Sequence, residues 1–430
     1  MSQNMLTQGT SLPSAVSRRG FLKGAAAAAA VAAQAASVPV AQAQDLDSQG
    51  FGGGGSFGSS RFAYLGTYTV GNGGNGEGIY LYRSNPITGE LVFLKVAAST
   101  PSPSFLVASR SGKFLYAVNE VSNFQGNSGS VSAFSVNRQT GDLTLINTVS
   151  SQGAGATFIS IDALGKFLFV ANYGAGTLAV IPINQDGSVG SATDVRTDVG
   201  NVGPTTATNA PPGSFAISGH DAPHVHCAII DPKNKYVLQT DLGQDRIYVY
   251  SLDPASGKLS PAEVPFVSLP PGDGPRHLAF HPNGRWLYSI QEEASTLTFF
   301  SYDASSGGLT SQQTISALPP GFAGTSFASE LQVSDDGRFL YAANRLHDSI
   351  AVFSVNFKGE LKYVGEAATR GDYPRGFTID PTGNFLYSCN QRSDNLTSYR
   401  INRDTGVPKF IGQYVPAGSP SCMIFLPSGR

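Results

Sequence analysis

Arg285-Trp286-Leu287-Tyr288 is one of seven similar segments that decide the fold of this 430-residue chain. Each segment is a short aromatic-rich run that follows a glycine or a polar turn. The other six are Arg61-Phe62-Ala63-Tyr64, Lys113-Phe114-Leu115-Tyr116, Lys166-Phe167-Leu168-Phe169, Lys235-Tyr236-Val237-Leu238, Arg338-Phe339-Leu340-Tyr341 and Asn384-Phe385-Leu386-Tyr387. In chain order their spacings are 52, 53, 69, 50, 53 and 46 residues. A unit repeated at about 50 residues indicates a repeat architecture.

Each repeat has the pattern of four short antiparallel strands. After the aromatic run comes a second alternating strand, such as Ser349-Ile350-Ala351-Val352-Phe353-Ser354-Val355. A hairpin turn such as Asp404-Thr405-Gly406 leads to a final strand, and one more strand, such as Gly376-Phe377-Thr378-Ile379, precedes each aromatic run. Four antiparallel strands form one propeller blade, so the sequence predicts an all-β, seven-bladed β-propeller over residues 61–430.

The two ends of this region are complementary. The chain ends at Met423-Ile424-Phe425-Leu426-Pro427-Ser428-Gly429-Arg430, the first strand of a blade without its second. Arg61-Phe62-Ala63-Tyr64 is a second strand without its first. We therefore expect the C-terminal strand to complete the first blade, which would cover otherwise unpaired strand edges. The 69-residue spacing indicates one insertion, from Thr197 to Pro223, which we expect to be a long loop over one face.

Residues 1–43 are predicted to be a twin-arginine signal peptide. Ser17-Arg18-Arg19-Gly20-Phe21-Leu22-Lys23 is similar to the twin-arginine export motif, an alanine-rich stretch follows, and Ala41-Gln42-Ala43 offers a small-residue cleavage site. Residues 44–60 have the composition of a flexible, glycine-rich leader. The predicted location is the periplasm or the cell exterior, with transient contact to the twin-arginine export machinery and no stable membrane anchor, since the apolar stretch is short for a span.

Composition narrows the class of ligand. The formal charge of −2 and the absence of a Lys/Arg-rich run argue against nucleic acid and anionic membranes, so a small molecule is the expected partner. Cys227, Cys389 and Cys422 are too few and too widely spaced for a disulfide framework or a metal site, and we expect buried thiols. No P-loop, dinucleotide fingerprint or Gly-x-Ser-x-Gly elbow is present, and no cofactor is predicted.

Because the repeats are in register, equivalent positions can be compared between blades. Two columns of polar residues stand out. Ten residues before the aromatic landmark, or at the matching place in the C-terminal strand, are Ser104, Thr157, His226, Arg276, Ser329, Arg375 and Ser421. Six residues after the landmark are Tyr68, Glu120, Tyr173, Leu242, Glu292, Arg345 and Gln391. In an antiparallel pair the start of one strand lies beside the end of the next, so both columns are expected at one mouth of the central channel.

Four members of these columns combine an imidazole, a carboxylate and two guanidiniums on blades four to six. We expect them to be catalytic, in a site suited to acid/base chemistry on an anionic substrate: His226, Arg276, Glu292 and Arg345. The expected substrate-binding residues are Arg375, Glu120, Tyr173 and His224. A metal bound by His224 and His226 is not predicted, because the neighbouring third side chain is an arginine.

Other polar residues are assigned to structure. His277 and His281 are interpreted as packing or turn residues. Asn119, Asn172, Asn344 and Asn390 are assigned to turns, because asparagine tolerates a left-handed backbone.

The motifs around these residues resemble one known family. Gly274-Pro275-Arg276-His277, Ala343-Asn344-Arg345 and Asp372-Tyr373-Pro374-Arg375-Gly376-Phe377 are similar to segments of the propeller-type 6-phosphogluconolactonases, a family that includes carboxymuconate lactonising enzymes. The resemblance spans all seven blades. It implies that the family's active-site histidine, first arginine, glutamate and second arginine correspond to His226, Arg276, Glu292 and Arg345.

The resemblance implies a lactone hydrolase, a carboxylic ester hydrolase that opens a sugar lactone. In the expected mechanism His226 is the general base for water, and the two arginines bind an anion and the developing oxyanion. Glu292 orients His226 or returns a proton to the leaving group. Two alternatives remain at this stage: a cycloisomerase that forms or opens muconolactones, for which Arg375 would supply extra positive charge, and a non-catalytic propeller that binds a cell-envelope partner.

Overall fold

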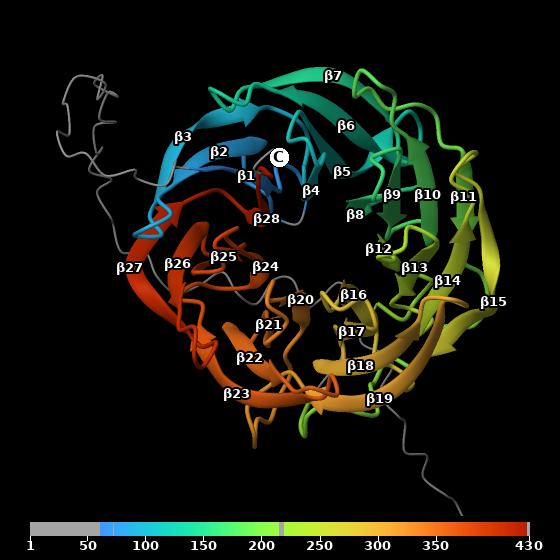
Figure 1. The fold of residues 1–430 in the computed structure, drawn as a ribbon, viewed down its shortest axis with the longest axis vertical. Helices are drawn as coiled ribbons and strands as arrows, with labels where there is room; N and C mark the ends of the chain where they lie inside the picture. The colour runs from blue at the N-terminus through green and yellow to red at the C-terminus, as the bar shows by residue number, and fades with distance from the viewer. Residues whose placement is uncertain (1–60, 72, 215–218, 428–430) are drawn as a thin grey trace, which may run out of the picture. The chain divides into compact units, whose positions relative to one another are not determined.

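A computed structural model provides the structure, which describes residues 61–427 except residues 72 and 215–218. The described part of the chain forms 28 strands in seven four-stranded antiparallel sheets, arranged as blades around a centre (Figure 1). The predicted signal peptide (1–43) and leader (44–60) lie outside the described residues. In the part of the chain that is described, no helix is long and apolar enough to cross a membrane. The prediction of an all-β, seven-bladed propeller is confirmed.

The strands are ordered from the centre outward in every blade. Blade 1 contains β28 (Pro420–Phe425), β1 (Arg61–Thr67), β2 (Ile79–Ser84) and β3 (Leu91–Ala98). Blade 2 contains β4 (Phe105–Ala108), β5 (Phe114–Phe124), β6 (Ser128–Val136) and β7 (Leu143–Ser150). Blade 3 contains β8 (Ala156–Ile161), β9 (Phe167–Asn172), β10 (Thr177–Pro182) and β11 (Asp194–Thr197). Blade 4 contains β12 (Val225–Ile230), β13 (Tyr236–Asp241), β14 (Arg246–Leu252) and β15 (Leu259–Ser268).

The last three blades follow the same order. Blade 5 contains β16 (Pro275–Phe280), β17 (Trp286–Gln291), β18 (Thr296–Asp303) and β19 (Gly308–Ser316). Blade 6 contains β20 (Ala328–Val333), β21 (Phe339–Asn344), β22 (Ser349–Val355) and β23 (Leu361–Ala368). Blade 7 contains β24 (Pro374–Ile379), β25 (Phe385–Asn390), β26 (Asn395–Ile401) and β27 (Pro408–Pro416).

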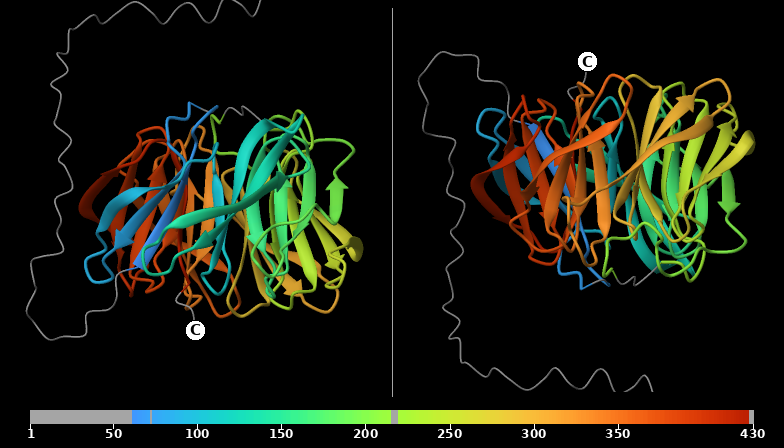
Figure 2. Two further views of the ribbon diagram at one scale, coloured as in Figure 1. Left: turned by 90° about the horizontal axis from the view of Figure 1, so that it is seen from above. Right: turned by 90° about the horizontal axis from the view of Figure 1, so that it is seen from below.

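The two ends of the propeller close the ring, as predicted. Strand β28 pairs antiparallel with β1, so that Leu65 lies opposite Met423 and Ala63 opposite Phe425. Figure 1 shows β28, in red, next to β1, in blue. The innermost strands β4, β8, β12, β16, β20, β24 and β28 surround the centre, and the side views show the connections between strands at the two faces (Figure 2).

The blades are held together by a contact that recurs at all seven interfaces, which we call the aromatic–glycine contact. Gly89, in the outer hairpin of blade 1, has a φ of +80°, and a Cβ added there would lie 2.2 Å from the ring of Phe385 in blade 7. Glycine alone accommodates both the backbone and the approach of the ring. The seven pairs are Phe62 with Gly141, Phe114 with Gly187, Phe167 with Gly257, Tyr236 with Gly307, Trp286 with Gly359, Phe339 with Gly406 and Phe385 with Gly89.

A tyrosine hydroxyl reinforces several of these contacts. The hydroxyls of Tyr64, Tyr288 and Tyr341 donate to the carbonyl oxygens of the partner glycines Gly141, Gly359 and Gly406, at 2.8, 2.9 and 3.0 Å respectively. These tyrosines are the last residues of the repeated segment and are buried. The repeat that identified the fold is therefore the element that joins each blade to the next.

The insertion joins blade 3 to blade 4 and lies along the connections that lead into blades 5 and 6. Its Thr208 amide donates to the Pro271 carbonyl at 3.3 Å, and its Pro212 carbonyl accepts from the Gly324 amide at 2.8 Å. Gly219 lies beside the site, since a Cβ there would lie 2.5 Å from the Tyr173 hydroxyl oxygen. The insertion is thus held at the face where the inner strands begin.

The asparagine column has a structural role, but the predicted reason was wrong. None of Asn119, Asn172, Asn344 or Asn390 has a positive φ; the left-handed residues lie a few positions later, as at Ser295 and Asp348. Instead the buried Asn172 side chain donates to the Ser151 carbonyl at 2.8 Å, and Asn344 donates to the Ala317 carbonyl at 2.7 Å. These asparagines bind the connection that enters their own blade. The three cysteines are buried and unpaired, as expected.

Candidate active site

The first polar column lies on a set of β-bulges. In β8, β12, β16, β20, β24 and β28 the pairing register shifts at or beside Thr157, His226, Arg276, Ser329, Arg375 and Ser421. A bulge places an extra residue in one strand and redirects its side chain. Most of the inner strands therefore turn a polar side chain toward the channel at the same level.

The two columns meet in a cavity of about 450 Å³ at the channel mouth. It is lined by Glu120, Thr157, Tyr173, His226, Glu292, Arg345, Tyr373, Arg375, Gln391 and Arg392. Directly below lies a void of about 10 Å³, lined by Tyr68, Ser104, Phe105, Thr157, Arg276, His277, Glu330, Arg375 and Ser421. Thr157 and Arg375 line both spaces. The structure thus brings six of the eight expected site residues into the cavity wall, Arg276 into the layer below, and leaves His224 outside.

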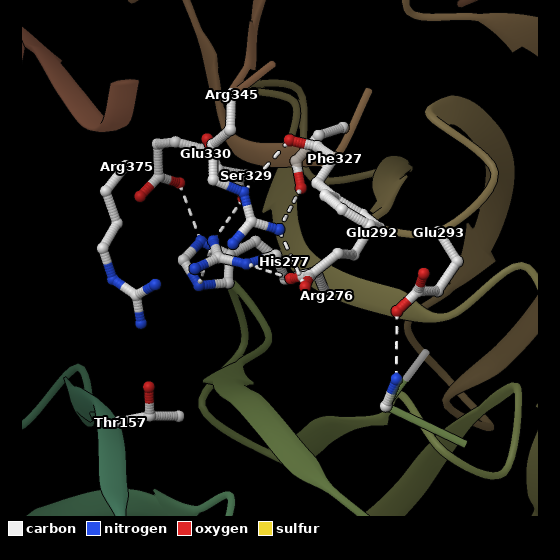
Figure 3. Close-up of polar contacts among 12 residues, drawn as sticks. Thr157, Arg276, His277, Glu292, Glu293, Phe327, Ser329, Glu330, Arg345 and Arg375 are labelled. Atoms are coloured by element: carbon white, nitrogen blue, oxygen red, sulfur yellow. Dashed lines mark hydrogen bonds and ion pairs between the residues drawn. The ribbon is translucent and has the colours of Figure 1, made fainter. Parts of the chain in front are cut away.

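Glu292 is the centre of the charged network (Figure 3). It follows β17, and its two carboxylate oxygens accept from different guanidiniums: Oε2 from Arg276 Nε at 2.8 Å and Oε1 from Arg345 Nη2 at 2.8 Å. Burial opposes ionisation, but the charges of Arg345 and Arg276 outweigh it and lower the pKa of Glu292. Glu292 is therefore an ionised carboxylate at neutral pH and can only accept hydrogen bonds.

The two arginines of this network differ in their other partners. Arg276 lies below the cavity and also donates to the Ser329 carbonyl, and burial lowers its pKa to about 10. Arg345 lies in the cavity wall, donates to the Phe327 carbonyl at 3.1 Å and contacts the Tyr373 hydroxyl at 3.3 Å. Arg345 can therefore reach a ligand, while Arg276 acts on the cavity through Glu292.

His226 lies in the wall with a neutral imidazole. Burial, followed by the charge of Arg276, lowers the pKa of His226 well below its ordinary value. Its Nδ1 is buried without a hydrogen-bond partner. The ring packs edge-on against Tyr173 and His277, with centroid distances of 5.6 and 5.1 Å. Within the described residues no hydrogen bond joins His226 to Glu292. Glu292 therefore does not orient the His226 ring by direct contact in this structure.

The opposite wall carries a second carboxylate and a further guanidinium. Glu120 Oε2 accepts from the Tyr68 hydroxyl at 2.7 Å and from Thr157 Oγ1 at 3.3 Å. Arg375 Nη2 lies 3.9 Å from the same oxygen, and its guanidinium lies 4.9 Å from the Tyr68 ring centroid. Because Arg375 is less fully engaged than Arg276 or Arg345, it is the more available of the three for an anion.

Two cavity residues were not identified from the sequence. Tyr373 lies in the connection before β24 with a φ of +65°, unusual for an aromatic residue. Its ring lies between two guanidiniums, 3.7 Å from Arg392 and 5.2 Å from Arg345. Tyr373 lies two positions before Arg375, and Arg392 lies one position after Gln391, so the comparison of equivalent positions between blades selected neither. Tyr373 does belong to the family-like segment from Asp372 to Phe377.

His224 packs behind the cavity wall. Its ring stacks on Tyr173 with a centroid distance of 4.1 Å and an interplanar angle of 7°. Its Nδ1 bonds to the Tyr173 carbonyl and its Nε2 to Asp221, both at 2.8 Å. His224 is not among the residues that line the cavity, and with both ring nitrogens bonded its side chain supports Tyr173. Its expected part in substrate binding stays a prediction. Within residues 61–427, apart from the gaps named above, no group of three His, Cys, Asp or Glu is placed to hold a metal.

Known proteins resemble this chain over most of its length. Residues 62–425 match the family model described as lactonase, 7-bladed beta-propeller. A 6-phosphogluconolactonase of Bacillus subtilis is 34% identical over 364 residues, which is 84% of this chain and 97% of that protein. One from Formosa agariphila is 34% identical over 81% of this chain and 96% of its own length.

Solved structures give the same result. The Pseudomonas aeruginosa periplasmic gluconolactonase is 31% identical, with a TM-score of 0.76 over 86% of this chain and 99% of that chain. A Bacteroides fragilis protein is 34% identical, with a TM-score of 0.77 over 87% of this chain and 99% of its own.

Proposed function

The chain belongs to the lactonase family of seven-bladed β-propellers, and we propose that it is a lactone hydrolase whose reaction takes place in the 450 Å³ cavity. The observation that carries this proposal is the Arg276–Glu292–Arg345 network beside a neutral His226. It combines an unprotonated imidazole with fixed positive charge in a cavity whose volume is in the range of small-molecule sites. The bond broken is the ring ester.

In the proposed mechanism, His226 removes a proton from water as the water oxygen attacks the lactone carbonyl carbon. Arg345 stabilises the negative charge that develops on the carbonyl oxygen, which is worth about 3 kcal/mol for a well-placed donor. The ring C–O bond then breaks, and the imidazolium returns the proton to the leaving oxygen. Glu292 is held ionised by its two arginines, so we assign it the orientation of water and substrate hydroxyls rather than proton return.

Binding of an anionic substrate would make His226 a better base. Arg375 and Arg345 both contribute to the lowered pKa of His226. A phosphate or carboxylate group beside these guanidiniums would offset part of their charge and raise the pKa of the imidazole toward the value that suits proton transfer at neutral pH. We therefore assign Arg375 to the substrate's anionic group, with Glu120 and Tyr173 as contacts for sugar hydroxyls.

The proposal is tested by incubating the purified chain with glucono-, 6-phosphoglucono- and muconolactones while acid release is followed. We expect opening of one or both sugar lactones, reduced about 10²–10⁴-fold by His226→Ala and by Glu292→Gln. Turnover unchanged in both variants would falsify the assignment of these residues. Turnover of muconolactone alone would favour the cycloisomerase, and no turnover at all would favour a binding protein.

We also propose that the protein acts after export by the twin-arginine route. The supporting observations are the Arg18-Arg19 motif and the likeness to a structure named as periplasmic. The double variant Arg18→Lys/Arg19→Lys should leave the precursor inside the cell, while the unaltered chain is recovered, shortened, from the periplasm. Equal recovery of both from the periplasm would exclude this route.

A further inference from the structure

A histidine–carboxylate pair, His277 with Glu330, lies directly beneath the cavity. His277 Nδ1 lies 2.9 Å from Glu330 Oε1, and His277 Nε2 lies 3.3 Å from Arg276 Nη1. Since Arg276 Nε bonds to Glu292, an unbroken chain of contacts runs from Glu330 to the carboxylate in the cavity wall (Figure 3). All its members are buried or nearly so.

The β-bulges explain how this chain arises. Arg276 and His277 are consecutive residues of β16, and in a regular strand they would point to opposite faces. The register of β16 shifts between Pro275 and His277, and the contacts of both side chains lie in the channel. A similar shift between Ala328 and Leu331 brings Glu330 of β20 to the same level.

The partners of His277 fix its protonation state. A carboxylate only accepts hydrogen bonds and a guanidinium only donates them. Nδ1 must therefore carry the proton that Glu330 accepts, and Nε2 must offer its lone pair to Arg276. A protonated imidazole would direct an N–H at the Arg276 guanidinium and break the chain at that point. Burial, the first of several influences, lowers the pKa of His277, consistent with a neutral ring.

The surroundings of His277 come from five other strands. The rings of Phe105 (β4) and Phe158 (β8) pack edge-on against it, at centroid distances of 5.8 and 5.0 Å. The charged and titratable groups that face it are His226 (β12), Arg276 (β16), Glu330 (β20) and Arg375 (β24). The side chain thus crosses the channel from blade 5 to blades 2 and 3.

We propose that His277 and Glu330 are positioning residues of the lactonase site: together they hold the Arg276 guanidinium, and through it the Glu292 carboxylate, in the orientation that faces the substrate. This inference rests on the proposed function for its kinetic consequence. The hydrogen-bond chain itself does not depend on which lactone is opened. Neither residue touches the cavity of about 450 Å³, so neither is a catalytic residue in the strict sense.

The kinetic test compares variants that keep or remove the acceptor for Arg276. His277→Leu removes it, and we expect kcat on the preferred lactone to fall about 100-fold with KM within about threefold, because Arg345 and Arg375 remain. His277→Gln supplies an amide oxygen and should recover at least tenfold of that loss. The matched controls are His347→Gln and Glu366→Gln, from a partly exposed pair 3.1 Å apart that does not line the cavity, and both should retain wild-type kcat. Wild-type kcat in His277→Leu, or equal losses in the controls, would overturn the proposal.

A second readout does not require activity. Imidazole ¹⁵N shifts, assigned by the signal lost in His277→Gln, should show the neutral Nδ1–H tautomer at pH 7. Glu330→Gln removes a negative charge that favours the protonated ring, so His277 should stay neutral to a lower pH, and any acid limb of kcat due to it should shift the same way. An Nε2–H tautomer or a protonated ring at pH 7 would overturn the proposal. An inactive wild type with the expected tautomer would refute the lactonase function and leave the positioning chain intact.

Discussion

The outer part of the propeller repeats, whereas the channel mouth does not. At every blade interface an aromatic side chain packs on a hairpin glycine of the next blade, and the residue types hardly vary. At the mouth, equivalent positions carry threonine, histidine, arginine and serine in turn. Packing at the interfaces imposes the same shape seven times, because all seven junctions must be alike for the ring to close. The mouth has no such requirement, and each blade there can supply a different functional group.

The largest expected effect is on stability and lies at an interface. Gly89→Ala adds a methyl group 2.2 Å from the buried Phe385 ring at a left-handed backbone position. Strain and overpacking together should cost about 4 kcal/mol, measured by denaturant unfolding. Gly321→Ala is the matched control, with φ +82° and no atom within 4 Å of the new Cβ, and should cost about 1 kcal/mol. Equal costs would mean that the aromatic–glycine contact has no special role.

The second largest effect is expected at the channel mouth, where a substitution should lower kcat/KM and leave the unfolding free energy unchanged. Arg345→Lys keeps the charge but loses the planar fork that engages Glu292, the Phe327 carbonyl and the substrate oxygen together. We expect kcat/KM to fall about 100-fold, or about 2.7 kcal/mol. Arg338→Lys, at an exposed pair with Asp336, should leave kcat/KM unchanged. A functional Arg345→Lys would show that charge alone serves the site.

The pH dependence of the unfolding free energy should report on the contact between Glu293, beside the site, and the insertion. Burial raises the pKa of Glu293, whose carboxylate accepts from the Gly219 amide of the insertion, to about 7. The folded state then binds more protons than the unfolded one between about pH 4.3 and 7, so this group's contribution to stability is lost as pH rises through that window. The unfolding free energy of the wild type should therefore fall as the pH rises through this window. In Glu293→Gln this fall should be smaller, by up to about 1.4 kcal/mol per pH unit. An unchanged pH slope in this variant would contradict the assignment.

The smallest effect should come from the outer rim of the same repeating part. Phe357 is 87% exposed and lies two residues before Gly359, where an added Cβ would lie 2.8 Å from the Trp286 ring. Phe357→Ser should change the unfolding free energy by less than about 0.5 kcal/mol. A larger loss would show that the hairpin itself, and not its glycine, stabilises the interface.

The same contrast explains what the sequence could predict. The repeat gave the blades, the closure and the alignment of both columns, because one packing rule governs all seven copies. The bulges break the two-residue alternation of a strand, so the inward turn of His277 and Glu330 was not predictable from register. Tyr373 and Arg392 belong to irregular connections, and the packing of His224 behind Tyr173 depends on the insertion, which has no counterpart in other blades.

The aromatic–glycine contact also has a direction. Every blade presents an aromatic face to the blade that follows it in the chain and a glycine face to the blade before it, as in a polymer whose units join head to tail. Contacts of that kind end only in a filament or in a ring. Here the contact from Phe385 to Gly89 makes it a ring. A circular permutant opened at a connection between two blades would therefore keep all seven junctions. A chain shortened by one blade would be left with two complementary faces and should associate with copies of itself.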